Sequence, residues 1–126
     1  MHNMTENEIS YIIRGAIYKV YNELGPGLLE SIYEAALCYQ LRKDGLHIAS
    51  QVPLKVLYDG KTLPIDYRLD ILVEDKVIIE IKSVEEMKYL FHKQLLTYMR
   101  IAKVRLGILV NFNTGDINSN IIRKIL

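Results

Sequence analysis

The fold of this chain is decided by residues 66–82, which read DYRLDILVEDKVIIEIK. Two runs rich in β-branched and aliphatic residues, 67–73 and 77–81, flank the polar trio 74–76. Apolar runs of this length on either side of a short polar segment are typical of two antiparallel strands joined by a tight turn. The stretch therefore predicts a β-hairpin in the middle of the chain.

The register of this hairpin brings three charged side chains together. With Asp75 at the centre of the turn, Asp70 stands directly opposite Glu80. Opposed residues have their Cβ atoms roughly 4.5 to 5.5 Å apart on the same side of the sheet. Lys82 shares that side with Glu80, because side chains alternate along a strand. We therefore expect Asp70, Glu80 and Lys82 to converge on one face.

Two carboxylates at that separation indicate a metal site. They repel each other unless a proton or a cation lies between them, and acid oxygens suit Mg²⁺ or Mn²⁺ better than Zn²⁺. The side chain of Lys82 would then steer an attacking water as an ammonium, or deprotonate it as a neutral amine. The alternative is a solvated strand face with an ion pair worth up to about 1 kcal/mol. The apolar run around Glu80 counts against it, because charges in a fully buried strand are costly without a partner.

These residues resemble a known nuclease signature. Asp70 with Glu80, Ile81 and Lys82 is similar to the Asp, Glu-x-Lys pattern of the PD-(D/E)XK nuclease superfamily. One position departs from the superfamily's name, since Leu69 stands where the name has proline, and members often lack that proline. Three residue types at loose spacing are a weak signal on their own, so the specificity of the resemblance depends on further motifs.

Two further motifs support the resemblance. Residues 27–33, GLLESIY, match the naming motif of the GxxExxY protein family, a branch of this superfamily, and residues 66–70 are similar to the same branch. Gln94 and Tyr98 match the Gln-x-x-x-Tyr pattern that follows the Glu-x-Lys strand in exonuclease-like members. This pair would orient the nucleic-acid strand or a metal-bound water. The resemblance spans residues 5 to about 110.

The resemblance implies a metal-dependent nuclease. Asp70 and Glu80 would hold Mg²⁺ (or Mn²⁺), with the backbone carbonyl of Ile81 as an extra ligand, and Lys82 would position the attacking water. Glu30 would project into the site as an outer acid, directly or through water. A carboxylate in the first turn of a helix is also favoured by the helix dipole, which gives Glu30 a purely structural explanation.

Length and composition limit the remaining interpretations. At 126 residues, half of them hydrophobic, the chain is expected to form one ordered domain over residues 1–126. The net charge is only +1, whereas nucleic-acid binders usually show a basic excess. A single cysteine, Cys38, excludes a disulfide within the chain and a Cys-cluster zinc site. No apolar run approaches the roughly 20 residues that span a bilayer, and residues 1–5 lack the features of a signal peptide, so we expect a cytoplasmic protein without a membrane partner.

The order of predicted elements defines the fold class. Thr5 and Glu8 form a capping box ahead of an apolar stripe of helical spacing, Asp59-Gly60 predicts a tight turn, and Ser83 is placed to cap a helix. The predicted elements are helices from Thr5 to Leu24, over 29–43 and over 84–102, and strands over 48–51, 54–58, 61–63, 67–73, 77–82 and 104–110. The last strand follows a long crossover, so it should run parallel to a neighbour. This order predicts an α/β (or α+β) fold with a mixed sheet flanked by helices, as the restriction-endonuclease-like fold of the resemblance implies.

The interpretation we adopt is a metal-dependent nuclease that hydrolyses phosphodiester bonds of nucleic acid, with DNA as the expected substrate. Two others stay open. One is a catalytically silent nuclease-fold module that binds nucleic acid or protein and acts through a partner. The other is a structural or regulatory homodimer, suggested by Tyr11, Tyr18 and Tyr21 along the first helix and by a short chain that offers one active site for a duplex with two strands.

Overall fold

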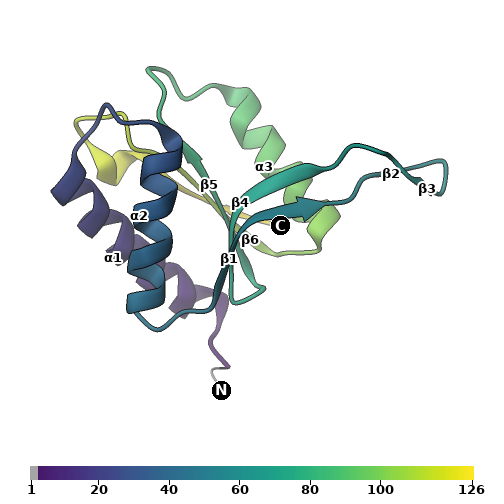
Figure 1. The fold of residues 1–126 in the computed structure, drawn as a ribbon, viewed down its shortest axis with the longest axis horizontal. Helices are drawn as coiled ribbons and strands as arrows, with labels where there is room; N and C mark the ends of the chain where they lie inside the picture. Colours follow the sequence, from purple (N-terminus) through teal and green to yellow (C-terminus); the bar gives the residue numbers. More distant parts are fainter. Residues whose placement is uncertain (1–2) are drawn as a thin grey trace.

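The computed structural model has three layers, with helices on both faces of a mixed sheet (Figure 1). The sheet order is β1–β4–β5–β6–β7; β5 and β6 are parallel and the other neighbours are antiparallel. Its strands are β1 (Ile48–Leu54), β4 (Tyr67–Val73), β5 (Val77–Lys82), β6 (Leu106–Asn111) and β7 (Ile121–Ile125). The helices are α1 (Glu6–Leu24), α2 (Glu30–Lys43) and α3 (Tyr89–Ala102), and β2 (Leu57–Tyr58) with β3 (Lys61–Thr62) forms a separate ribbon that projects from the sheet. The predicted mixed sheet flanked by helices is confirmed.

The structure describes residues 3–126, so the sequence prediction on residues 1–5 lies partly outside it. Within that range, no helix has the length and the apolar composition needed to cross a membrane. The predicted elements and candidate site residues all lie within the described range.

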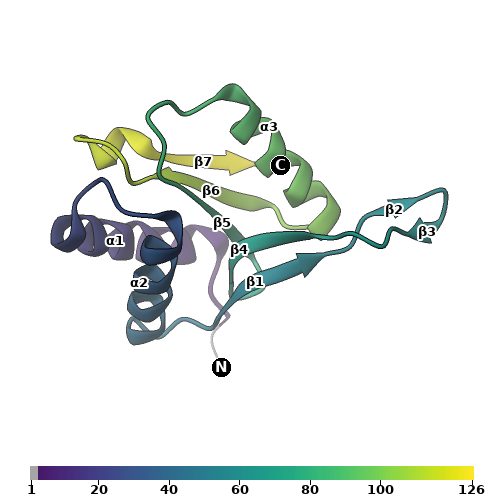
Figure 2. The same cartoon turned by 45° about the horizontal axis from the view of Figure 1, so that its top comes forward.

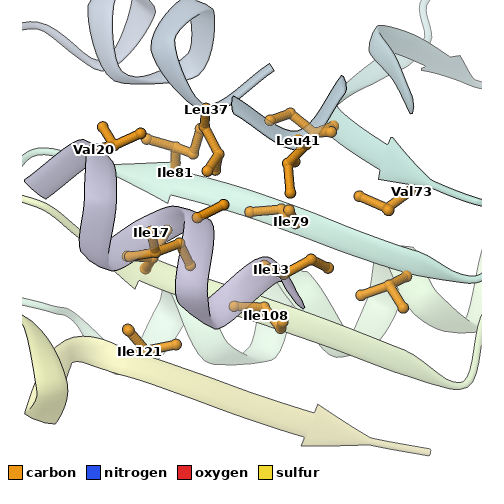
Figure 3. Close-up of a cluster of buried hydrophobic side chains, with 14 of the residues drawn as sticks. Ile13, Ile17, Val20, Leu37, Leu41, Val73, Ile79, Ile81, Ile108 and Ile121 are labelled. Carbon is orange, nitrogen blue, oxygen red and sulfur yellow. The ribbon is translucent and has the colours of Figure 1, made fainter. Parts of the chain in front are cut away.

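Two apolar clusters join the layers. On one face of the sheet, side chains of α1 and α2 pack on β4, β5 and β6 (Figure 3); the labelled members include Ile13, Ile17, Leu37, Leu41, Ile79, Ile81 and Ile108. On the other face, Ile78 and Leu109 meet Leu95 and Met99 of α3. A Cβ on Gly107 of β6 would lie 2.7 Å from the Met99 sulfur, so the missing side chain lets α3 approach the sheet closely. β5 is therefore apolar on both faces and forms the centre of the fold.

Local sequence signals are confirmed where they act within a few residues. The Thr5 hydroxyl accepts the N–H of Glu8 at 3.2 Å, and the N–H of Thr5 donates to Glu8 Oε1 at 2.9 Å, which completes the capping box. Asp59 and Gly60 have φ of 54° and 73°, as a two-residue turn of this hand requires, and they join β2 to β3. β4 and β5 pair in the predicted register. β5 and β6 are parallel, as the crossover argument predicts.

The predicted start of the third helix is wrong. α3 begins at Tyr89 rather than near residue 84, and Ser83 does not cap it. The Ser83 hydroxyl donates instead to the carbonyl of Leu28 at 2.6 Å. The Asn111 side chain accepts the N–H of Val84 and donates to its carbonyl, which holds this segment out of the helix. Tertiary hydrogen bonds therefore override the local capping signal.

The predicted division of the first strands is wrong as well. The first predicted strands, 48–51 and 54–58, are not separate there, because β1 runs unbroken through Pro53 to Leu54. β1 lies at the edge of the sheet, where the N–H that proline lacks is not needed for pairing. No element is predicted from the sequence after residue 110; the structure has a short 3₁₀ turn at Ile117–Asn120 and then β7, which pairs with β6.

Candidate active site

The candidate site lies where β4 parts from β5. Their pairing ends at Ile71 and Ile79, whereas β4 continues beside β1 to Tyr67 and β5 continues beside β6 to Lys82. β1 and β4 therefore turn away from β5 and β6, as Figure 2 shows. We call this opening the fork. A fork in a sheet leaves buried backbone N–H groups that need other partners.

Two carboxylates supply these partners. Asp70 Oδ2 accepts the N–H of Ile81 at 2.7 Å, and Glu80 Oε2 accepts the N–H of Asp70 at 3.0 Å. Each acid thus reaches across to the opposite strand, so the two carboxylates lie side by side in the fork. Lys82 is close enough for its charge to lower the pKa of both acids. The structure brings Asp70, Glu80 and Lys82 together.

The three side chains meet across the gap and do not share one regular sheet face. Leu69 and Leu72 both pack on the α3 side although they are an odd number of residues apart, so the alternation of β4 breaks at Asp70. Asp70 is influenced by acids of α2, whereas Lys82 lies over an aromatic ring of α3. The convergence expected from strand alternation is therefore reached through the opening of the fork.

Both acids are in an environment that disfavours their charge. Burial is the main cause that raises the pKa of Asp70 to about 6, against the hydrogen bond from the Ile81 N–H, and the charge of Glu34 adds to it. Burial also raises the pKa of Glu80 to about 7, and the charge of Asp70 is the second cause. The pair titrates as a coupled unit. Both carboxylates therefore bind a proton or a cation more readily than ordinary acids do.

Glu30, the first residue of α2, lies beside the end of β5. Its Oε2 accepts the N–H of Ser83 at 3.1 Å, one residue beyond β5. Its negative charge also contributes to the raised pKa of Asp70. Glu30 thus borders the fork from the α2 side, and its carboxylate is already engaged by the backbone.

Tyr33 closes the loop that presents Glu30. Its hydroxyl donates to the carbonyl of Gly25 at 2.5 Å and accepts the N–H of Leu28 at 3.1 Å. Its ring stacks on Phe112, with centroids 4.4 Å apart. Gly27 within this loop has φ of 98°, which glycine adopts without strain. The glycine and the tyrosine of residues 27–33 therefore fix the loop that positions Glu30.

α3 forms an aromatic wall beside the fork. Tyr98 stacks on Tyr67 with ring centroids 3.9 Å apart, and Lys82 Nζ lies 4.4 Å from the centroid of the Phe91 ring. Gln94 comes three residues after Phe91 and four before Tyr98, so it lies on the same side of the helix. It is half-buried, and within residues 3–126 its amide makes no side-chain hydrogen bond. The amide is therefore available to a ligand.

Sequence reasoning missed two residues of this region. The Tyr67 hydroxyl donates to Glu80 Oε1 at 2.8 Å, and burial raises the pKa of Tyr67. Glu34, whose carboxylate accepts the amide of Gln51, adds its charge to Asp70. Glu34 lies four residues after Glu30, so helical spacing could have indicated it. Nothing in the local pattern marks Tyr67, because its contact depends on the fork.

The donor groups in the fork fit a hard divalent cation. Asp70 and Glu80 offer carboxylate oxygens, and Mg²⁺ is commonly held by one or two carboxylates with several waters. The carbonyl of Lys82 accepts the N–H of Phe112. The N–H of Ile81 points to β4 instead, and its carbonyl points the same way. Within residues 3–126, no three His, Cys, Asp or Glu side chains gather into a group that could hold a metal ion. The two acids and this carbonyl are therefore the set that the fork provides.

A five-stranded mixed sheet flanked by helices is consistent with the restriction-endonuclease-like fold. The chain belongs to the PD-(D/E)XK nuclease superfamily, whose family model matches residues 7–124. Nucleases of this superfamily generally use divalent metal ions.

Similarity to individual proteins is limited. The crystal structure of SSO0001 is similar, with a TM-score of 0.50 and 25% sequence identity. The match covers 94% of this chain and 57% of SSO0001, so the chain spans a little over half the length of that protein. No curated protein matches the chain significantly.

We expect Tyr67→Phe to raise the pKa of Glu80 by about one unit, because a hydrogen bond to a charged group is worth roughly 1.5 to 3 kcal/mol and the variant removes one. The phenylalanine ring keeps the stacking on Tyr98, so the fold should persist. Carboxyl-carbon NMR titration measures the change. Tyr11→Phe, at a tyrosine of α1 that is 81% exposed, is the matched control. Unchanged titration of Glu80 would show that the hydroxyl does not stabilise its charge.

Proposed function

We propose that the chain is a metal-dependent nuclease that hydrolyses phosphodiester bonds of nucleic acid, with DNA as its substrate. The observation that carries the proposal is the pair of adjacent carboxylates in the fork, Asp70 and Glu80, whose pKa values are raised to about 6 and about 7. Such a pair is relieved by a cation, and Lys82 adds an ammonium beside it. Membership of the nuclease superfamily supports the same chemistry.

Each residue of the fork has a role in this proposal. Asp70, Glu80 and the carbonyl of Ile81 hold Mg²⁺ or Mn²⁺. A bound ion of this kind lowers the pKa of a water and stabilises the charge that develops on the phosphate. Lys82, steadied against the ring of Phe91, orients the attacking water. Glu30 acts as an outer acid whose place is fixed by Ser83.

The amide of Gln94 and the ring of Tyr98 complete the site by orienting the nucleic-acid strand. Both lie on the side of α3 that borders the fork, and Tyr98 is fixed by stacking on Tyr67. We also assign the chain to the GxxExxY branch of the superfamily. The hydrogen bonds of Glu30 and Tyr33 support this assignment, since they give the motif a definite task beside the fork.

A second candidate is a catalytically silent module that binds nucleic acid or protein, as a homodimer or through another partner. The hydrogen bonds of the fork favour it, because Asp70 and Glu80 each accept a backbone N–H that would otherwise be unpaired. These hydrogen bonds give Asp70 and Glu80 a structural role in the sheet that does not depend on any reaction.

Cleavage assays with single- and double-stranded DNA and RNA, in EDTA, Mg²⁺ and Mn²⁺, separate the two candidates. We expect cleavage with Mg²⁺ or Mn²⁺ and none in EDTA. Metal should also raise the melting temperature by mass action, with about 2.7 kcal/mol of stabilisation at a metal concentration of 100 Kd. A melting shift without cleavage of any substrate would favour the silent module, and cleavage that persists in EDTA would contradict metal dependence.

A further inference from the structure

Basic residues gather on one segment of a chain that is nearly neutral overall. Between Met87 and Gly115 there are five lysines and arginines and no aspartate or glutamate, although the whole chain has a net charge of only +1. The five are Lys88, Lys93, Arg100, Lys103 and Arg105. The rest of the chain is therefore net acidic. A local basic excess is the electrostatic mark of a nucleic-acid-binding surface, and the overall charge conceals it.

Part of this charge follows the outward face of α3. Lys93 and Arg100 are seven residues apart, which places them two turns apart on one side of the helix. Lys103, directly after the helix, continues the row, and all three side chains are exposed. Leu95 and Met99 face the sheet, so the row faces solvent. None of the three cations forms a salt bridge with any residue in the described range 3–126.

Tyr89 adds an exposed aromatic ring to this row. It lies one turn before Lys93 and is 75% exposed. The ring of His92 is stacked beside it at 6.5 Å between centroids, and Lys93 Nζ lies 5.5 Å from its centroid. A ring that is steadied by neighbours yet mostly open to solvent offers a face on which a base can stack. Alternation of aromatic rings and cations is typical of proteins that bind single strands.

The row begins next to the fork. Phe91, two residues after Tyr89, lies beneath the ammonium of Lys82, with Nζ 4.4 Å from the ring centroid. Tyr89 and Phe91 belong to the same first turn of α3 but lie on roughly opposite sides of the helix, so a strand bound at Lys82 reaches Tyr89 by passing around the N-terminal end of α3. The stacking surface and the three cations therefore start at the end of α3 that lies nearest Lys82, and they run along the side of the helix that faces solvent.

We propose that the outward face of α3 binds an unpaired nucleic-acid strand, with Tyr89 stacking on a base and Lys93, Arg100 and Lys103 contacting phosphates. The inference rests on the proposed function and deepens it, since it names an unpaired strand beside the cleaved bond as the substrate class. A duplex does not present a base face to Tyr89, because its bases are stacked on one another, whereas unpaired bases are free to stack on aromatic side chains.

Fluorescence anisotropy tests the inference without any cleavage. A labelled single-stranded DNA oligonucleotide and its duplex are titrated with the full chain in EDTA. We expect Tyr89→Ala to weaken single-strand binding by about 5- to 150-fold, the range found when a stacking ring is lost, and Tyr89→Phe to preserve it. Lys93→Gln should reduce the slope of log K against log salt by about 0.7. Tyr11→Ala, at an equally exposed tyrosine on the opposite layer, is the matched control and should change nothing.

Three results would overturn the inference. Tyr89→Ala could bind the single strand as tightly as Tyr11→Ala does. The duplex could bind as tightly as the single strand, with Lys93→Gln but not Tyr89→Ala weakening it. Tyr89→Ala could abolish self-association in sedimentation without affecting the oligonucleotide, which would make this face a protein interface. Tyr89-dependent binding without cleavage by the wild type would instead refute only the nuclease proposal, whereas cleavage without dependence on Tyr89 would refute only this inference.

Discussion

Asp70→Asn should lower the rate of metal-dependent cleavage by on the order of 10³-fold while leaving the fold intact. The amide has the shape of the carboxylate but no charge, so it is a poor ligand for a hard cation. Its oxygen can still accept the N–H of Ile81, which preserves the hydrogen bond of the fork. In chelator the variant should melt at the same temperature as the wild type or higher, because the repulsion between Asp70 and Glu80 is gone.

The measurement pairs single-turnover cleavage with melting curves in EDTA, Mg²⁺ and Mn²⁺. Asp59→Asn is the matched control: it makes the same chemical change at the tip of the projecting β2–β3 ribbon, where asparagine tolerates the positive φ. That variant should keep both the activity and the metal response. An Asp70→Asn protein whose melting temperature responds to metal as the wild type does would rule out Asp70 as a ligand.

Without metal, the protein should lose stability as the pH rises from 5 to 8. The folded-state pKa values of Asp70 and Glu80, about 6 and about 7, lie above the ordinary values near 4. The folded state therefore keeps protons that the unfolded chain releases, so the stability is greatest below the unfolded pKa and is lost as the pH passes through 6 and 7. One pKa unit corresponds to about 1.4 kcal/mol. Because the two acids share one repulsion, we expect a loss on the order of 3 kcal/mol, or about 10 °C in melting temperature.

Thermal melts in EDTA across this pH range check the expectation. Glu80→Gln should flatten most of the dependence, and saturating Mg²⁺ should restore stability at pH 8 in the wild type. The lowered pKa values of Glu8 and Asp66 act at lower pH, outside this window. The lowered pKa of His92 makes stability rise with pH, which is the opposite effect. It is present in both the wild type and Glu80→Gln, so it cancels when their melting temperatures are subtracted. A wild type that becomes more stable between pH 5 and pH 8 would contradict the expected state of the pair.

The sequence predicts best what a few neighbouring residues determine. The register of the β4–β5 hairpin follows from the length of its turn, so the pairing of Val73 with Val77 could be derived by counting. The fork could not be derived, because it depends on β4 following β1 while β5 follows β6. Tyr67 was missed for that reason, since its hydroxyl reaches Glu80 only where the strands have separated.

Residues far apart in sequence could be linked to the site only through motifs. Nothing in the spacing of Glu30 indicates that it reaches the end of β5, where Ser83 binds it. The same region explains why the predicted start of the third helix is wrong. The Ser83 hydroxyl donates to the carbonyl of Leu28, in a distant segment of the chain, and does not cap the helix that follows it. β7 escaped prediction since its short pattern, 121–125, forms a strand only when β6 lies beside it.

The glycine at position 107 affects the width of the fork although it lies outside it. It lies under α3, where a methyl group would collide with the Met99 sulfur at 2.7 Å and with Leu95 Cδ1 at 2.9 Å. The helix that carries Phe91, Gln94 and Tyr98 therefore rests directly on bare backbone. A side chain at this position would push α3 away from the sheet. The aromatic side chains of α3 would then lie farther from Asp70 and Glu80. The absence of a side chain at Gly107 therefore helps to set the distance between α3 and the sheet, and with it the width of the fork, although Gly107 contacts none of the site residues.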